Sequence, residues 1–143
     1  MRSQKLALLA GIVLLSTGCS VKNLANRIEK QNAKMADTIC SCDEIADAFE
    51  GAGLGSCEDL FTSFEFTDCQ LDALETDKKA SKETLSCQLE LLEDANNCLD
   101  DKFECSADST AYEECTDLDY ESCPELPESV YAELEKCNPD EQQ

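Results

Sequence analysis

The residues of this chain best suited to chemistry are its cysteines. The sequence holds eleven of them and no histidine. One, Cys19, follows an N-terminal apolar segment. The other ten are Cys40, Cys42, Cys57, Cys69, Cys87, Cys98, Cys105, Cys115, Cys123 and Cys137. Ten cysteines can pair completely, so the sequence predicts up to five disulfide bridges in a compartment where disulfides persist.

Spacing argues against two other uses of these thiols. Zinc sites typically use pairs of Cys or His with two to four intervening residues. Cys40 and Cys42, the one tight pair, have a single residue between them. That pair could instead exchange disulfides, but such pairs usually have two intervening residues. Its acidic neighbours, Asp43, Glu44 and Asp47, disfavour a reactive thiolate. We therefore expect structural bridges to different helices, with thiol–disulfide exchange as the competing function.

Calcium is suggested by acidic residues near the C-terminus. They stand at positions 1, 3, 5, 9 and 12 of an EF-hand-like loop and are Asp117, Asp119, Glu121, Glu125 and Glu128. The turn position that needs glycine is Ser122, and Pro124 and Pro127 stiffen the loop. We expect weak cation binding by the acidic surface at most, with no dedicated metal site and no cofactor.

Catalytic patterns are missing from the sequence. Without histidine there is no His-dependent triad or dyad. With 32 acidic residues, carboxylate pairs occur at every spacing by chance, and no G-x-S-x-G nucleophile elbow is present. We therefore expect that the protein is not an enzyme.

The first 18 residues have the pattern of a cleavable export signal. Arg2 and Lys5 precede an uncharged apolar run over residues 6–15, and small residues follow. The run is too short to cross a bilayer, which takes roughly 20 apolar residues.

Residues 15–19 (LSTGC) resemble the lipobox of bacterial lipoproteins. The resemblance implies cleavage before Cys19 and attachment of lipid to its sulfur, which would anchor the protein to a membrane. Ser16 stands where that family usually has Leu, so secretion without lipid is the alternative. Ser20 differs from the Asp that retains many such proteins at the inner membrane, which favours the outer membrane in a Gram-negative cell.

Charge divides the mature chain into two parts. Residues 20–36 carry a net charge of +3, and residues 37–143 carry −26. So acidic a surface repels nucleic acid and excludes DNA or RNA as a partner. Solubility is the simplest role of this charge; a basic protein partner or divalent cations are the alternatives.

Helical periodicity begins directly after Cys19 and extends over residues 21–48. Val21, Ile28, Met35 and Cys42 are spaced by heptads. The helix could form a short coiled-coil seam or pack on its own domain. Its basic face could also contact anionic headgroups beside the anchor.

Turn and cap signals divide the remainder. Residues 51–55 are glycine-rich and predict a turn, after which Ser56, Thr67 with Gln70, and Ser81 are candidate N-caps. The strongest helix covers residues 82–104, and shorter helices are expected at 109–116 and after Pro127. The densest aromatic group is expected in the core and comprises Phe61, Phe64 and Phe66, with the apolar Leu60 beside them.

Two pairs of cysteines are centred on the same point of the chain. Cys57 and Cys98, like Cys69 and Cys87, lie symmetrically about position 78, where a polar stretch could reverse the chain. The arrangement resembles the twin-Cys helical hairpins of coiled-coil-helix-coiled-coil-helix domains, although the spacers are longer here. The resemblance implies nested bridges Cys57–Cys98 and Cys69–Cys87.

Together these patterns predict an all-α protein: a small disulfide-stapled bundle of about four to five helices. Residues 1–18 would be the signal peptide, 19–50 a lipid-anchored stalk helix, and 51–143 an acidic cysteine-rich domain. The expected function is a non-catalytic structural or binding module of the cell envelope, attached to the membrane through Cys19.

Overall fold

The described parts of the chain consist of helices joined by loops. The computed structural model describes residues 19–53, 55–62, 65–106 and 110–137, without the side chains of residues 60–62. No strand occurs within these ranges, which confirms the all-α class. The helices are α1 (Val21–Cys40), α2 (Asp43–Gly51), α3 (Cys57–Thr62), α4 (Asp68–Leu74), α5 (Lys78–Lys102), α6 (Thr110–Thr116) and α7 (Glu128–Lys136), with 3-10 turns η1 (Glu75–Asp77) and η2 (Tyr120–Ser122).

Several expectations lie outside the described parts. The signal peptide and most of the lipobox fall in residues 1–18. The side chains of Leu60, Phe61 and Phe64 are likewise not described. Of the aromatic group, Phe66 is described; it is partly buried and packs against the core.

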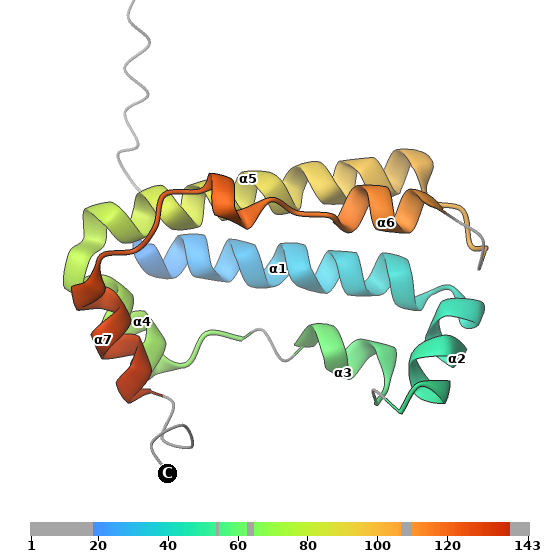
Figure 1. Cartoon of the computed structure of the whole chain (residues 1–143), viewed down its shortest axis with the longest axis horizontal. Coiled ribbons are helices and arrows are strands. Elements are labelled where there is room, and N and C mark those ends of the chain that lie inside the picture. The colour runs from blue at the N-terminus through green and yellow to red at the C-terminus, as the bar shows by residue number, and fades with distance from the viewer. Residues whose placement is uncertain (1–18, 54, 63–64, 107–109, 138–143) are drawn as a thin grey trace, which may run out of the picture.

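The two longest helices, α1 and α5, lie side by side and run in the same direction (Figure 1). Two ion pairs show the register: Arg27 Nη2 lies 2.8 Å from Glu93 Oε1, and Lys34 Nζ lies 2.6 Å from Asp100 Oδ2. Both pairs advance by seven residues on both helices, as neighbouring helices do in a parallel coiled coil.

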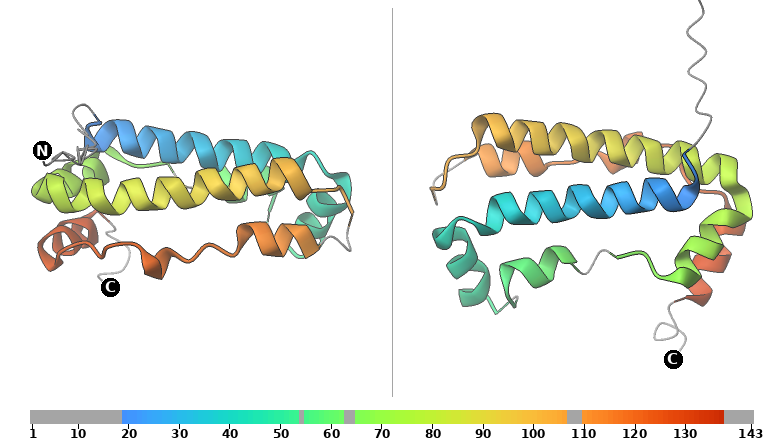
Figure 2. Two further views of the ribbon diagram at one scale, coloured as in Figure 1. Left: turned by 90° about the horizontal axis from the view of Figure 1, so that it is seen from above. Right: turned by 180° about the vertical axis from the view of Figure 1, so that it is seen from behind.

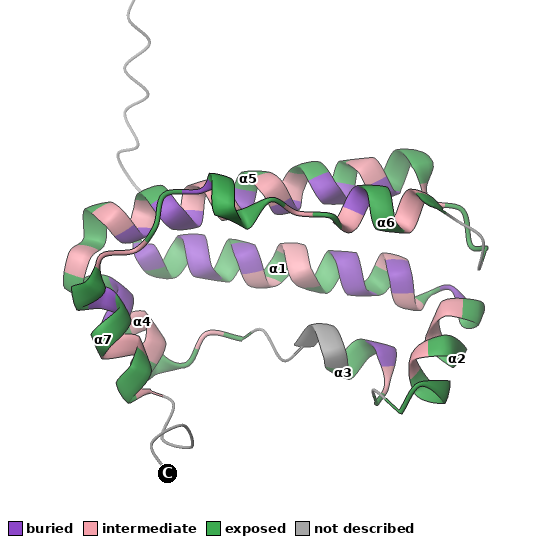
Figure 3. Cartoon of the chain, in the orientation of Figure 1, coloured by how far each residue is buried: buried purple, intermediate pink, exposed green. Residues whose placement is uncertain are grey.

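Apolar residues at heptad spacing fill the seam between α1 and α5. Val21, Ile28 and Met35 are buried on α1, and Leu85, Leu92 and Leu99 are buried on α5. Figure 3 shows buried residues recurring along the length of both helices. The heptad of α1 therefore packs within its own domain, which was one of the two alternatives for it.

This packing corrects the predicted division of the chain at residue 50. Helix α1 does not project as a stalk, because its apolar face supplies part of the core that α5 completes. Residues 19–50 and 51–137 therefore share one core. The predicted single helix over 21–48 also ends early: α1 stops at Cys40, and α2 starts after the extended residue Cys42.

Because α1 and α5 are parallel, each must be followed by a segment that returns along the bundle. Figures 1 and 2 show α2 and α3 leading back from the end of α1 to α4, and α6 and η2 leading back from the end of α5 to α7. Helices α4 and α7 contact each other at the end where α1 and α5 begin. The two ends of the bundle therefore differ: α4 and α7 lie where the long helices begin, and α2 lies where α1 ends.

Local capping explains where most helices start. The side chains of Ser20 and Ser56 accept hydrogen bonds from the backbone three residues on, and Thr67 with Gln70 forms the expected capping box. The prediction for Ser81 is wrong. Asp77 caps α5 one turn earlier, and Ser81 is fully buried inside the helix.

The turn predicted at residues 51–55 is confirmed where it is described. Gly53 and Gly55 have φ angles of 73° and 92°. These lie in the left-handed region that glycine adopts without steric cost.

Candidate functional site

All ten cysteines beyond residue 39 are paired in the folded chain. The five bridges are Cys40–Cys57, Cys42–Cys105, Cys69–Cys137, Cys87–Cys123 and Cys98–Cys115. Three of them join a long helix to its own return segment: Cys40–Cys57 and Cys98–Cys115, which each span 17 residues, and Cys87–Cys123, which spans 36. The prediction of five bridges is confirmed.

The nested pairings Cys57–Cys98 and Cys69–Cys87 are wrong. They assumed one antiparallel hairpin centred near residue 78. In the structure α3 packs against α1, so Cys57 meets Cys40 at the end of α1. Cys69 lies on α4, which packs against α7 and brings it to Cys137.

Cys40 and Cys42 are not bonded to each other. Each is bonded to a distant partner, Cys57 in α3 and Cys105 just beyond α5. Cys42 is completely buried. The expectation of separate structural bridges is confirmed, and no disulfide is shared between these two neighbours.

Cys19 is the one cysteine without a bond. It lies immediately before Ser20, the N-cap of α1, and is partly buried against the edge of the core. Cys19, which stands at the lipobox-like position, is therefore the cysteine that forms no disulfide.

The acidic loop does not fold as an EF-hand. The 3-10 turn η2 forms at Tyr120–Ser122, and the next residue, Cys123, is tied to Cys87 on α5. Pro124 lies against α5 as well, since its carbonyl accepts a 2.8 Å hydrogen bond from Thr84 Oγ1. Within the described ranges, no group of three or more Cys, Asp or Glu residues could hold a metal ion.

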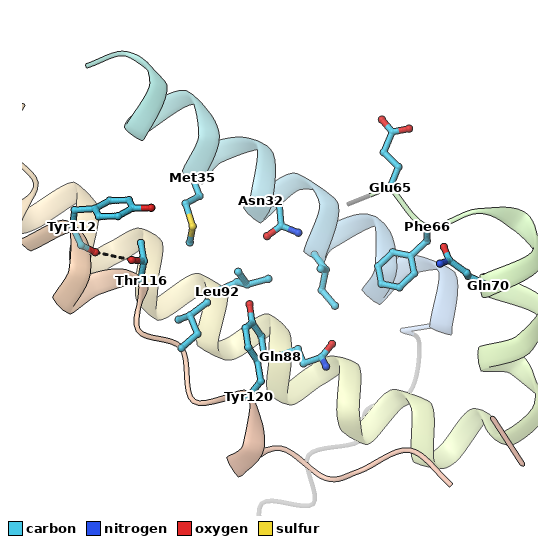
Figure 4. Close-up of a pocket in the computed structure, with 12 residues that line it drawn as sticks. Asn32, Met35, Glu65, Phe66, Gln70, Gln88, Leu92, Tyr112, Thr116 and Tyr120 are labelled. Carbon is cyan, nitrogen blue, oxygen red and sulfur yellow. Dashed lines mark hydrogen bonds between the residues drawn. The ribbon is translucent and has the colours of Figure 1, made fainter. Parts of the chain in front are cut away.

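A pocket of about 630 Å³ opens between the two return segments (Figure 4). Helices α1 and α5 form its floor, the segment before and into α4 one wall, and α6 with η2 the other. Its apolar lining consists of Ile28, Met35, Phe66, Leu92, Tyr112, Leu118 and Tyr120. Ligand pockets commonly have volumes of about 300–1,000 Å³ and an apolar lining of this kind.

A few polar side chains line the same pocket. They are Asn32, Glu65, Gln70, Gln88 and Thr116. Tyr120 is 45% exposed, and the partial burial of its side chain raises the pKa of its hydroxyl above the usual value. The pocket therefore offers amide and hydroxyl groups, one carboxylate and no cationic side chain.

The sequence does not predict this pocket. Its lining comes from four separate segments, and each residue has an ordinary local role as a helix, cap or turn residue. Phe66 was expected in the core, and it does pack against the core while also lining the pocket. No periodicity within one segment could have indicated a cavity between them.

In the described part of the chain, no helix is long and apolar enough to cross a membrane. Compared with models of known protein families, with curated proteins and with solved structures, the chain has no match in any of the three.

Proposed function

We propose that this protein is a non-catalytic binding module of the bacterial cell envelope, held at the membrane by lipid on Cys19. The pairing of the other ten cysteines supports this most directly, because it leaves Cys19 alone and at the start of the folded domain. The five bridges themselves indicate an oxidising compartment outside the cytosol.

The anchor is tested by replacing the attachment residue. Cys19→Ser should move the protein from the membrane fraction to the soluble fraction, with all five bridges intact. Ser16→Leu is the matched control, since it restores the usual lipobox residue and should leave the protein in the membrane fraction. Recovery of the unaltered protein in the soluble fraction, with an N-terminal peptide free of lipid, would instead establish the secreted form.

The pocket supports binding over a purely structural role. Its lining is apolar and aromatic, and the whole chain has a net charge of −21. The negative electrostatic field of the chain disfavours anionic ligands, so the pocket suits a small neutral or cationic apolar molecule.

The binding role is tested with a neutral, environment-sensitive naphthylamine dye and the Cys19→Ser chain. We expect saturable fluorescence enhancement. Asn32→Trp should weaken the affinity for the dye at least about tenfold, because the larger indole takes space from the pocket. Asn26→Trp is the control, since Asn26 is exposed on the same helix and does not line the pocket. Equal dye binding by both variants would contradict the assignment of the pocket.

A further inference from the structure

We propose that the domain stands upright on an anionic bilayer, with the end formed by η1 and the first turns of α1 and α5 facing the headgroups. The proposal rests on the lipid anchor at Cys19 and adds the orientation of the head, which the anchor alone does not determine.

The position of Cys19 restricts how the head can be held. Only Ser20 separates Cys19 from the first residue of α1. Because α1 and α5 are parallel, the first turn of α5 lies at the same end of the bundle, as Figure 2 shows. A lipid on Cys19 would therefore bring the start of α5 close to the bilayer surface.

This end is nearly neutral in an otherwise acidic domain, because four lysines lie among the acids Glu75, Asp77 and Glu83. Lys22 is exposed on α1; at the start of α5, Lys78 and Lys79 are exposed and Lys82 is partly exposed. Long, exposed ion pairs to Glu75 (3.6 Å) and Glu83 (3.9 Å) leave Lys78 and Lys79 free to reach headgroups. Each lysine at an anionic surface can strengthen the contact about fivefold.

The opposite end is strongly acidic. Helix α2 has four acidic residues and no basic one, and α5 ends near Asp100 and Asp101. The 20 residues of α1 separate the two ends by about 30 Å. That distance exceeds the Debye length of about 8–10 Å, so the bilayer would not repel these acids in an upright head.

Lying flat on α1 is the less favourable arrangement. The basic residues Arg27 and Lys34 are held in short ion pairs with Glu93 and Asp100, at 2.8 and 2.6 Å, and are less free to reach headgroups than Lys78 and Lys79. Helix α2 would also approach the surface. Upright placement keeps the nearly neutral end, which carries the four lysines, in contact with the bilayer and keeps the acidic end away from it.

Single tryptophans can report the orientation, because the chain has none of its own. The reporters are Thr76→Trp in η1, Ala33→Trp in the middle of α1 and Ala48→Trp in α2, all at exposed positions. The chain from Cys19 to its C-terminus, which contains every described residue, is coupled through the Cys19 thiol to maleimide lipids. The vesicles contain phosphatidylglycerol and dansyl-labelled headgroups, and energy transfer from tryptophan to dansyl is measured.

We expect transfer to be strongest from position 76, weaker from 33 and near zero from 48. Lys78→Gln with Lys79→Gln should bring the three values closer together, as should phosphatidylcholine vesicles. Lys34→Gln with Lys102→Gln, which removes equal charge elsewhere, should leave the order unchanged. Transfer that is equal at all three positions, or strongest from 33 or 48, would overturn the proposal. Chemical coupling makes this result independent of whether cells attach lipid to Cys19.

Discussion

At the scale of single residues, Asn96 shows how narrowly the seam between α1 and α5 is specified. Asn96 is only 2% exposed on α5. Its Nδ2 donates to two oxygens of Gln31 on α1, the backbone carbonyl at 3.0 Å and the side-chain Oε1 at 2.7 Å. A buried polar residue in a helix seam fixes register because a shifted partner would leave it without hydrogen bonds.

Replacing this donor by an acid tests the seam. Asn96→Asp should cost about 3 kcal/mol or more at pH 7, because it puts a carboxylate against two oxygens in a buried site. Asn97→Asp is the matched control, since Asn97 is exposed on the same helix and should change stability little. Urea unfolding of both variants with the disulfides intact measures the difference; equal stability would show that the seam is solvated.

Tyr120 gives the fold a pH dependence in the alkaline range. Its pKa is raised by partial burial in the fold, so the folded state holds the phenolic proton more tightly than the unfolded chain. This contribution to stability is complete below the unfolded pKa of about 10 and is lost as the pH rises from there through the folded pKa. Tyr120→Phe should flatten the loss of stability above about pH 10, measured by urea unfolding; an unchanged slope would contradict this role.

At the scale of elements, the sequence predicted where helices start better than which helices pack against each other. The capping box at Thr67 and Gln70 and the start of α7 after Pro127 follow from local chemistry, and both are present. The prediction for Ser81 failed because serine and aspartate are both good N-cap residues. Asp77 caps α5 one turn earlier, and packing of the helix buries Ser81.

The α1–α5 pair carries much of the apolar core, and its contribution can be measured on one helix. Leu99 is 1% exposed in the seam, whereas Leu91 on the same helix is only partly buried. Leu99→Ala should cost about 2–5 kcal/mol through lost burial and a cavity. Leu91→Ala should cost clearly less in the same chemical denaturation series; the reverse order would place the core on another face of α5.

At the scale of the whole molecule, the bridges supplement a core of modest size. The chain has five Phe, three Tyr and no Trp. Bridges that join segments 17 to 68 residues apart restrict the unfolded chain and can each contribute about 2–4 kcal/mol. Reduction by dithiothreitol should therefore abolish most of the helical circular dichroism at neutral pH without denaturant; retention of the native spectrum would mean that packing alone suffices.

The number of bridges could be predicted from the sequence, but their pairing could not. Pairing depends on the directions of α1 and α5, which bring Cys57 to Cys40 and Cys98 to Cys115. A symmetric spacing about residue 78 carries no information on those directions. The pocket was equally beyond sequence reasoning, because it exists only once both return segments lie along the long helices.

The intact mass of the protein extracted from membranes, with free thiols alkylated and the disulfides left unreduced, reads lipid attachment and cysteine pairing together. We predict a chain that begins at Cys19, carries diacylglycerol and takes up no alkyl group; after reduction, ten groups should be added. An unlipidated chain alkylated at Cys19, or native alkylation at any of the ten paired cysteines, would contradict this prediction.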